Sequence, residues 1–330
     1  MKICVLPGDG IGPEVTEEAV KILAALGDFT FVYGDIGYDA YQQIGSSLPD
    51  ETLQKIADAD ATLFGAVTTP PNIPNYESPI LKLRQHFDLY VNLRPCKTLP
   101  IEISHEGIDM DIVRENTEGL YSRRERVEDN GDTAITERVI TRKGSERIIR
   151  YAFELAKNNG RKTVTIVHKA NVLRATCGLF REVALEVAND YPNIEMNEQI
   201  VDACAMQLIK NPGQFEVIVT TNLFGDILSD AASMLVGGLG VAYSGNIGEH
   251  AAVFEPVHGS APKYVGTHNA NPLATILAAR LMLEHIGMDA EAKQLQTAIE
   301  QVLQDGNVTP DLGGSCTTQQ VTEHILEALQ

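Results

Sequence analysis

Short apolar runs alternate with amphipathic stretches along most of the chain. The apolar runs cover residues 2–7, 29–37, 61–67, 109–116, 163–171 and 216–222. After the first run, Val15, Ala19, Ile22 and Leu23 recur at helical spacing, which predicts an amphipathic helix behind this strand. Strands that alternate with helices in this way predict an α/β fold with a largely parallel sheet.

The first predicted strand runs into the sequence GDGIGPE, residues 8–14. A Rossmann fingerprint needs a third glycine where this chain has Pro13, and a Walker A loop needs a Gly-Lys-Ser/Thr ending that the stretch lacks. Pro13 at the first helical position, followed by Glu14, Glu17 and Glu18, predicts the start of a helix. Taken by itself, the stretch is interpreted as a tight turn between a strand and a helix.

One interval breaks the alternation of strands and helices. Asn130 and Gly131 stand between two segments that partly alternate apolar and polar residues, which predicts a β-hairpin near residues 122–140. Such a hairpin can be an ordinary surface loop or an arm that pairs with a second subunit, and the residues alone favour neither.

Composition narrows the function classes. The chain has 330 residues and a formal net charge of −19, which disfavours binding to nucleic acid or to an anionic membrane. Its five cysteines include no C-x-x-C pair, and isolated thiols suit a reducing compartment. The N-terminus enters a strand at once, and no apolar run approaches the length of a membrane span. We expect a cytoplasmic protein with neither a nucleic-acid nor a membrane partner.

Three arginines, Arg84, Arg94 and Arg114, lie beside predicted strand or helix ends in this acidic chain. A guanidinium binds a carboxylate through two parallel hydrogen bonds, so converging arginines would suit a di- or tricarboxylate substrate. Unrelated surface salt bridges would give the same spacing, and both interpretations stay open at this point.

Three aspartates provide the hard oxygen ligands that a divalent cation prefers. Asp226 and Asp230 stand four residues apart just after a predicted buried strand, and Asp202 lies in the sequence IVDACAMQL. A solvated helix face is the alternative interpretation of the Asp226–Asp230 spacing. Loops at the carboxyl ends of strands are where α/β sheets bind ligands, which favours the cation.

Two further segments carry candidate chemistry. Lys169 ends a predicted strand, and it either extends into solvent or, desolvated beside a metal ion, acts as a general base with Tyr121 as the acid. Residues 254–272 form a long segment rich in Gly, Pro and Asn. Loops of that length are usually functional, and its small residues would let a planar cofactor lie against the backbone.

Taken together, these motifs resemble the β-decarboxylating dehydrogenase family, which contains isocitrate, homoisocitrate, 3-isopropylmalate and tartrate dehydrogenases. The likeness runs from GDGIGPE to the sequence TPDLGG, residues 309–314. It implies two α/β domains with a mixed, largely parallel sheet and a dimerisation arm, which is not a standard Rossmann fold. It also implies a discontinuous cofactor-binding domain of residues 1–97 and 246–330, and a dimerisation domain of residues 98–245.

The resemblance assigns roles to individual residues. It implies a Mg²⁺ or Mn²⁺ ion held by Asp202, Asp226 and Asp230, with Lys169 as base, Tyr121 as acid and Asp202 also catalytic. It implies substrate contacts from Ser78, Arg84, Arg94, Arg114 and Asn171. It implies cofactor contacts from Ile11, Thr68, Thr69, His258, Gly259, Ser260, Ala261, Lys263, Tyr264, Asn271 and Asp311. Because Lys169 and Asp202 reach the other subunit's site in this family, it implies a homodimer with composite active sites, or a tetramer.

The same resemblance bears on substrate and cofactor. Ser78 matches isocitrate enzymes, whereas Ile80 replaces their asparagine; the run SPI…LR…YVNLRP is similar to the archaeal-type homoisocitrate branch. Homoisocitrate and/or isocitrate is the expected substrate, with 3-isopropylmalate and a catalytically silent regulatory subunit as alternatives. Lys263 and Tyr264 stand where NAD-using relatives carry an Asp, which favours NADP over NAD. Ala270, Pro310 and Gly314 lack the larger or charged residues usual in NADP enzymes.

Overall fold

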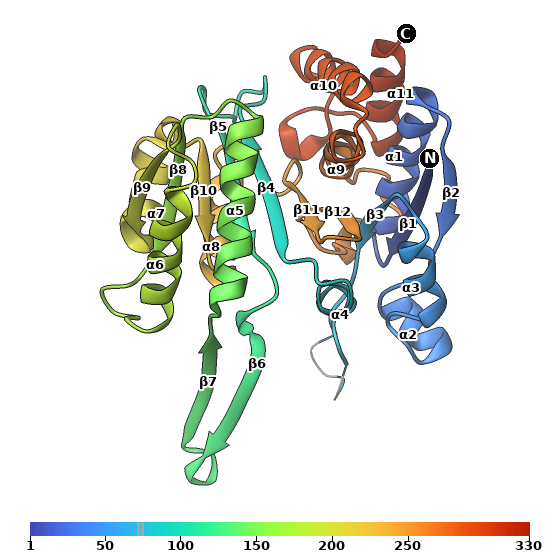
Figure 1. Cartoon of the computed structure of the whole chain (residues 1–330). Coiled ribbons are helices and arrows are strands. Elements are labelled where there is room, and N and C mark those ends of the chain that lie inside the picture. The colour runs from blue at the N-terminus through green and yellow to red at the C-terminus, as the bar shows by residue number, and fades with distance from the viewer. Residues whose placement is uncertain (71–72, 74–75) are drawn as a thin grey trace. The chain divides into compact units, whose positions relative to one another are not determined.

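The computed structural model describes residues 1–70, 73 and 76–330 (Figure 1). The chain divides into two compact units. Unit 1 comprises Met1–Leu89, Thr98–His105 and Ser233–Gln330, and unit 2 comprises Tyr90–Lys97 and Glu106–Ala232. The predicted boundary at residue 97 lies at the far end of a strand that belongs to unit 2. That the units are a cofactor-binding and a dimerisation domain stays a prediction.

Unit 1 is a sheet with helices on both faces. Its strand order is β2-β1-β3-β12-β11, in which only the β11–β12 pair is antiparallel. The strands are β1 (Lys2–Gly8), β2 (Thr30–Tyr33), β3 (Ala61–Ala66), β11 (Tyr243–Ile247) and β12 (Ala252–Pro256). The helices are α1 (Gly12–Leu26), α2 (Tyr38–Ile44), α3 (Asp50–Ala57), α4 (Pro79–His86), α9 (Leu273–His285), α10 (Asp289–Gln304) and α11 (Thr318–Ala328).

The strands of unit 1 pack helices against both of their faces. In β1, Cys4 and Leu6 contribute to a core that also contains Ile56 of α3 and Leu83 of α4. Helices α1 and α9 pack against strands of the same sheet, with α10 and α11 packed on them in turn. Since side chains alternate between the faces of a strand, the continuous apolar run of β1 serves both layers.

The GDGIGPE turn is built around the buried carboxylate of Asp9. Its Oδ2 accepts hydrogen bonds from the backbone N–H of Tyr38 at 2.8 Å and of Thr68 at 2.7 Å, and its Oδ1 accepts one from Asp39 at 2.9 Å. One side chain thus joins the end of β1 to the start of α2 and to the segment after β3. The helix α1 begins one residue before Pro13, at Gly12.

The glycines of this turn are required by close backbone approach. A Cβ at Gly8 would lie 1.9 Å from the carbonyl oxygen of Ala66, and one at Gly10 would lie 2.1 Å from that of Ser260. Both glycines also have positive φ, at 73° and 65°. The turn therefore crosses two other backbone segments at distances that only glycine allows.

Unit 2 has its own sheet, with strand order β4-β5-β10-β8-β9. The β4–β5 pair is antiparallel and the other pairs are parallel. The strands are β4 (Val91–Lys97), β5 (Asp109–Glu115), β8 (Thr163–His168), β9 (Glu195–Ile200) and β10 (Val217–Thr220). The helices are α5 (Arg142–Asn158), α6 (Thr176–Ala188), α7 (Val201–Lys210) and α8 (Asn222–Ser233). Helix α5 packs on β5, β10 and α6.

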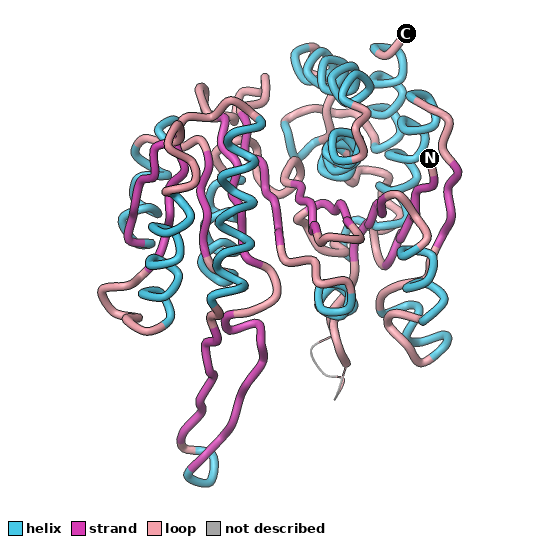
Figure 2. The backbone as a smooth tube through the Cα atoms, viewed as in Figure 1, coloured by secondary structure: helices cyan, strands magenta, loops and turns pink. Residues whose placement is uncertain are grey.

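The predicted hairpin is present in unit 2. Strands β6 (Gly119–Glu128) and β7 (Thr133–Val139) pair antiparallel across a 3₁₀ turn at Asp129–Gly131, and the ribbon extends away from the sheet of unit 2 (Figures 1 and 2). Its register slips between Gly119 and Arg124, so β6 carries a bulge near its base. Whether the hairpin pairs with a second subunit stays a prediction.

The predicted α/β architecture with a mixed, largely parallel sheet is confirmed. None of the helices in the described part of the chain is long and apolar enough to cross a membrane. Strands β4, β9, β11 and β12 were not expected from the pattern of apolar runs.

Replacing Asp9 tests whether its carboxylate holds unit 1 together. In Asp9→Asn the amide has one acceptor oxygen for three N–H donors and turns its own N–H toward at least one of them. We expect the free energy of unfolding to fall by about 1–3 kcal/mol, measured by urea denaturation. The exposed Asp28→Asn variant, which makes the same change of charge, should match the wild type; equal stability of both variants would contradict this role.

Candidate active site

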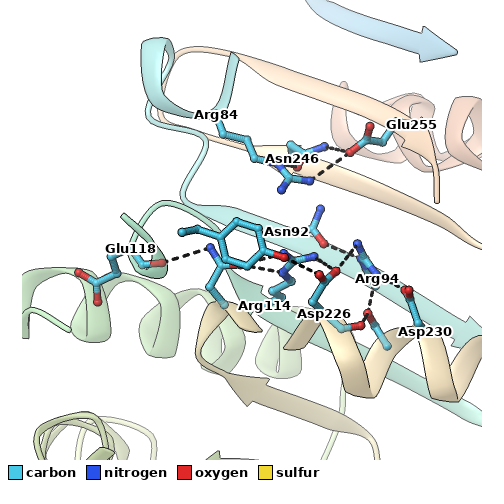
Figure 3. Close-up of polar contacts among 12 residues, drawn as sticks. Arg84, Asn92, Arg94, Arg114, Glu118, Asp226, Asp230, Asn246 and Glu255 are labelled. Atoms are coloured by element: carbon cyan, nitrogen blue, oxygen red, sulfur yellow. Dashed lines mark hydrogen bonds and ion pairs between the residues drawn. The ribbon is translucent and has the colours of Figure 1, made fainter. Parts of the chain in front are cut away.

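Arg114, next to the last residue of β5, is almost completely buried, at 1% relative exposure. Its Nε and Nη2 donate to the side-chain oxygen of Asn222 at 3.1 and 2.8 Å, and its Nη1 pairs with Asp226 Oδ1 (Figure 3). A Cβ at Gly225 would lie 2.6 Å from Cγ of Arg114. Asn222 and Asp226 of α8 therefore contact the guanidinium of Arg114, and Gly225 lies against the aliphatic part of the same side chain.

Arg94 on β4 binds the same helix one turn further on. Its Nη1 donates to Ser229 Oγ at 2.6 Å and to Asp230 Oδ1 at 2.7 Å, and its Nη2 lies 3.3 Å from Asp226 Oδ1. Its Nε donates to the side-chain oxygen of Asn92 at 2.7 Å. Arg94 and Arg114 thus both contact Asp226. That these two arginines converge with Arg84 on a substrate stays a prediction.

Tyr121 comes from the bulge of β6 and completes this cluster. Its hydroxyl donates to Asp226 Oδ2 at 2.6 Å, and its ring centroid lies 5.3 Å from the guanidinium carbon of Arg114. Ser122 Oγ donates to the carbonyl oxygen of Gly119 at 2.9 Å inside the bulge, where Arg123 adopts a φ of 54°. Bulges beside functional sites commonly re-aim a side chain, and this one carries the candidate acid.

Lys169 and Asp202 form a separate pair. Lys169 follows β8, Asp202 lies in the first turn of α7 after β9, and Lys169 Nζ lies 2.6 Å from Asp202 Oδ1. The hydrogen bond from Lys169 lowers the pKa of the Asp202 carboxyl below its ordinary value. Asn171 lies exposed two residues beyond Lys169. Within a single chain, therefore, Asp202 contacts Lys169 and not the carboxylates of α8.

Arg84 belongs to unit 1 and has its own carboxylate partner. From α4, its Nε donates to Asn246 Oδ1 at 3.1 Å, and its Nη2 lies 3.5 Å from Glu255 Oε1. Asn246 Nδ2 donates to the same Glu255 oxygen at 2.6 Å (Figure 3). Ser78 stands at the N-terminus of α4. All three predicted arginines are buried, which excludes the interpretation as surface salt bridges.

A cavity of about 740 Å³ lies within unit 1, which is enough room for a large part of a nucleotide cofactor. Seven of the predicted cofactor residues line it: Ile11, His258, Ala261, Lys263, Tyr264, Asn271 and Asp311. Thr267 and Asn269 of the predicted loop 254–272 line it as well, together with Ala270 and Pro310, which the sequence had already linked to cofactor choice, and two residues that were not predicted, Leu239 and Gly240. Both of these lie in the sequence VGGLG, whose glycines were the available signal.

The remaining predicted cofactor residues, Thr68, Thr69, Gly259 and Ser260, do not line the cavity, but Thr68 and Ser260 contact each other beside it. Thr68 Oγ1 lies 2.6 Å from Ser260 Oγ, and the backbone N–H of Ile11 donates to the carbonyl oxygen of Ser260 at 3.0 Å. Thr69 is exposed, and a Cβ at Gly259 would meet no atom within 4 Å. The GDGIGPE turn thus lies directly against the HGSAPKY segment.

His258 lines this cavity, and one nitrogen of its ring has no hydrogen-bond partner among the described residues. Burial lowers the pKa of its imidazole below the ordinary value, which favours the neutral ring. Its Nδ1 lies 3.0 Å from the carbonyl oxygen of Gly259, so Nδ1 carries the proton, and the buried Nε2 has no partner among residues 1–70, 73 and 76–330. A ligand with a hydroxyl or amide donor would satisfy it.

Comparison with known proteins decides the family. Residues 2–326 match the family described as isocitrate/isopropylmalate dehydrogenase. The chain belongs to this family. It is thus a decarboxylating hydroxy-acid dehydrogenase, of a class that depends on NAD(P) and a divalent metal ion, acts on small carboxylate substrates and is commonly dimeric.

Individual relatives of this dehydrogenase carry different names. A homoisocitrate dehydrogenase of Methanocaldococcus jannaschii is 50% identical, with 100% of this chain and 98% of that protein covered. A 3-isopropylmalate dehydrogenase of Archaeoglobus fulgidus is 49% identical, with 99% of each chain covered. The crystal structure of isocitrate dehydrogenase from Methylococcus capsulatus is 45% identical and superposes with a TM-score of 0.96 over 99% of both chains. The predicted fold is therefore confirmed. The substrate stays open, because relatives with different substrates in their names are about equally similar in sequence.

A single chain of the dehydrogenase provides some of the oxygen ligands that a hard divalent cation needs. Asp226 and Asp230 provide carboxylates one helical turn apart, in the oxygen chemistry that Mg²⁺ and Mn²⁺ prefer. In the described part of a single chain, however, no three His, Cys, Asp or Glu side chains lie close enough together to hold a metal ion. A third carboxylate from Asp202 would have to come from a second copy.

A methyl group on Gly225 tests the packing of α8 against Arg114. In Gly225→Ala the added Cβ meets Arg114, which its hydrogen bonds hold in place, and we expect the free energy of unfolding to fall by about 1–3 kcal/mol. Gly178→Ala in α6 is the matched control, because no atom lies within 4 Å of its added Cβ. The control should gain up to about 1 kcal/mol from helix propensity. Urea denaturation of both variants measures the contrast, and an equal response would contradict the tight packing.

Proposed function

We propose that this dehydrogenase oxidises and decarboxylates a 3-substituted malate to a 2-oxo acid, with homoisocitrate and/or isocitrate as its substrate. The observation that carries this proposal is the cluster of Arg94, Arg114, Tyr121, Asp226 and Asp230 in unit 2, which combines two guanidinium groups, a phenol and two carboxylates. Such a set suits the binding of a polycarboxylate beside a cation and the delivery of a proton.

In this proposal Arg84, Arg94 and Arg114 bind the substrate carboxylates, with Ser78 and Asn171 as further polar contacts. Asp226 and Asp230, with Asp202 of a second subunit, would hold Mg²⁺ or Mn²⁺, which supplies a Lewis acid for the oxygen at C2. Lys169 accepts the hydroxyl proton, and a bound NAD(P) would supply the hydride acceptor for C2. Tyr121 donates the proton that C3 requires once CO₂ has left, and its hydroxyl already lies on Asp226.

We infer a preference for NADP over NAD. Lys263 and Tyr264 line the cavity, both are exposed, and a lysine there attracts the 2′-phosphate that only NADP carries. The carboxylate of Asp311 accepts hydrogen bonds from Asn271 Nδ2 at 2.9 Å and from Thr309 Oγ1 at 2.5 Å, so both of its oxygens already have donors within the chain. The predicted contacts of Thr68, Thr69, Gly259 and Ser260 belong to this proposal as well.

We also infer a homodimer with composite active sites, or a tetramer built from such dimers. Lys169 and Asp202 pair with each other and not with the cluster around Asp226, as two halves of a shared site would. Met206 and Ile209 on α7 and Ile227 on α8 expose 64%, 79% and 60% of their surface, which an interface would cover. All five cysteines are free, which supports a cytoplasmic location.

Two alternatives to this function differ in their support. Ile80 packs against the apolar core beside Leu83, and an apolar environment would accept the isopropyl group of 3-isopropylmalate. A catalytically silent regulatory subunit is the other alternative, and the presence of Lys169, Tyr121, all three aspartates and all three arginines disfavours it.

The substrate is decided by measuring kcat/KM at 340 nm for isocitrate, homoisocitrate and 3-isopropylmalate, with Mg²⁺ or Mn²⁺ and with each cofactor. We expect a tricarboxylate with NADP to give the highest value, and omission of the metal to abolish turnover. The highest value with 3-isopropylmalate would overturn the substrate assignment, and a clear preference for NAD would overturn the role of Lys263. No turnover with any substrate would favour the silent subunit.

A composite site predicts complementation between inactive subunits. Lys169→Met and Tyr121→Phe should each be inactive as homodimers, since every site lacks the base or the acid. After mixing and subunit exchange, half of the sites in a heterodimer carry both changes and half carry neither. Activity should therefore reappear, up to about a quarter of the wild-type rate for a random mixture of dimers. A mixture that exchanges subunits, as mass spectrometry would show, yet stays inactive would contradict the composite site.

A further inference from the structure

Arg138 is a half-buried arginine at the base of the hairpin, near the end of β7. Its Nη1 lies 3.0 Å from both Thr176 Oγ1 and Cys177 Sγ, and its Nη2 donates to Thr221 Oγ1 at 2.7 Å. Its guanidinium carbon lies 4.9 Å from the ring centroid of Phe224. None of these partners is a carboxylate, and no carboxylate pairs with Arg138 elsewhere in the described part of the chain.

This lack of a counter-charge stands out in a chain of net charge −19. Arg142 pairs with Glu182 and Glu186, and Arg181 pairs with Glu198. Arg123, Arg124 and Arg174 pair with no carboxylate among the described residues, but they are exposed to solvent, whereas Arg138 is half-buried. A cation that is partly removed from water without a counter-charge costs free energy, which a bound anion would recover. The protein therefore keeps a positive charge here that its own residues leave uncompensated.

The guanidinium retains donors for such an anion. Three of its five N–H groups are occupied by Thr176, Cys177 and Thr221, which leaves the Nε–H and one Nη2–H without an acceptor among residues 1–70, 73 and 76–330. Nε and Nη2 lie on the same edge of the guanidinium plane. Two adjacent N–H donors on one edge match the two oxygens of a carboxylate.

Arg138 also lies next to elements that carry predicted catalytic groups. Thr221 immediately precedes α8, the helix of Asp226 and Asp230. Thr176 and Cys177 open α6, and backbone hydrogen bonds from Cys177 to Leu173 and from Leu173 to Lys169 connect this helix start to the turn of Lys169 and Asn171. The N-termini of two helices add positive partial charge at the same place.

The substrate chemistry supplies a matching anion. Homoisocitrate and isocitrate carry a third carboxylate on the substituent at C3, where 3-isopropylmalate carries an isopropyl group. In the segment before Arg84, on which substrate choice in this family depends, Ile80 and Leu81 are apolar. The one cation of this stretch, Lys82, already pairs with Glu77 at 3.1 Å. We propose that Arg138 binds this distal carboxylate and so selects tricarboxylate substrates. It would enter the active site of the other subunit together with Lys169 and Asn171, an inference that rests on the proposed function.

Arg138→Gln tests this inference because it removes the charge and the paired donors while keeping a polar side chain. We expect kcat/KM for the tricarboxylate that the wild type uses to fall about 100-fold, mainly through KM. The value for 3-isopropylmalate should stay at the wild-type level. Arg138→Lys keeps the charge but not the paired donors, so its kcat/KM for the tricarboxylate should lie between the values of the wild type and of Arg138→Gln. The matched control is Arg124→Gln, an exposed arginine of the same hairpin, and it should leave all three substrates unaffected.

Several results would overturn the inference. An equal loss with all three substrates would make Arg138 a structural link between the hairpin, α6 and α8, and no loss with the tricarboxylate would exclude it from the site. A wild type that turns over only 3-isopropylmalate would also exclude it, while leaving the proposed reaction intact. If the wild type turns over nothing, the proposed function fails. In that case the affinity for isocitrate in the presence of Mg²⁺, measured by calorimetry, tests the role of Arg138. If isocitrate does not bind, or if it binds the wild type and Arg138→Gln equally tightly, the role of Arg138 is overturned.

Discussion

The buried guanidinium of Arg114 is the constraint on which unit 2 depends. A positive charge at the end of a buried strand is tolerated only when it is neutralised and hydrogen-bonded, and here a single helix provides both. Asn222 and Asp226 supply the acceptors, and Gly225 lets the helix backbone approach closely enough to present them. The Asp226 carboxylate can accept further hydrogen bonds, and it receives them from Arg94 and Tyr121. The need to neutralise Arg114 therefore places the other candidate catalytic side chains as well.

The sequence predicted the fold best where burial leaves a continuous apolar run, as in β1, β3 and β10. It failed where buried strands carry polar residues for another purpose. β11 contains Asn246, which is fully buried but is needed by Arg84 and Glu255, and β4 contains Arg94 and Asn92, which face α8. β9 lies at the edge of its sheet and is largely polar, so its sequence EMNEQI resembles a loop. Strand prediction was therefore weakest where polar residues interrupt the apolar pattern of a strand.

The candidate site was predictable as a set of residue types but not as a set of partners. Spacing indicated that Asp226 and Asp230 share a helix face, and the structure adds that Arg94 joins them. No local pattern could reveal that Lys169 would pair with Asp202, because strand order in the sheet decides which loops become neighbours. For the same reason Glu255 was missed as the partner of Arg84, since the two residues lie 171 positions apart and meet only through tertiary folding.

The glycines of GDGIGPE have a consequence for how short motifs are interpreted. Their spacing resembles a signature for phosphate, yet at Gly8 and Gly10 the space of a side chain is taken by the chain's own carbonyl groups. These glycines mark a crossing point, where three stretches of backbone that are remote in sequence pass at van der Waals distance. A pattern of this kind is constrained by every strand and loop that meets there. It would persist through changes of ligand, and it identifies an architecture more reliably than it identifies a substrate.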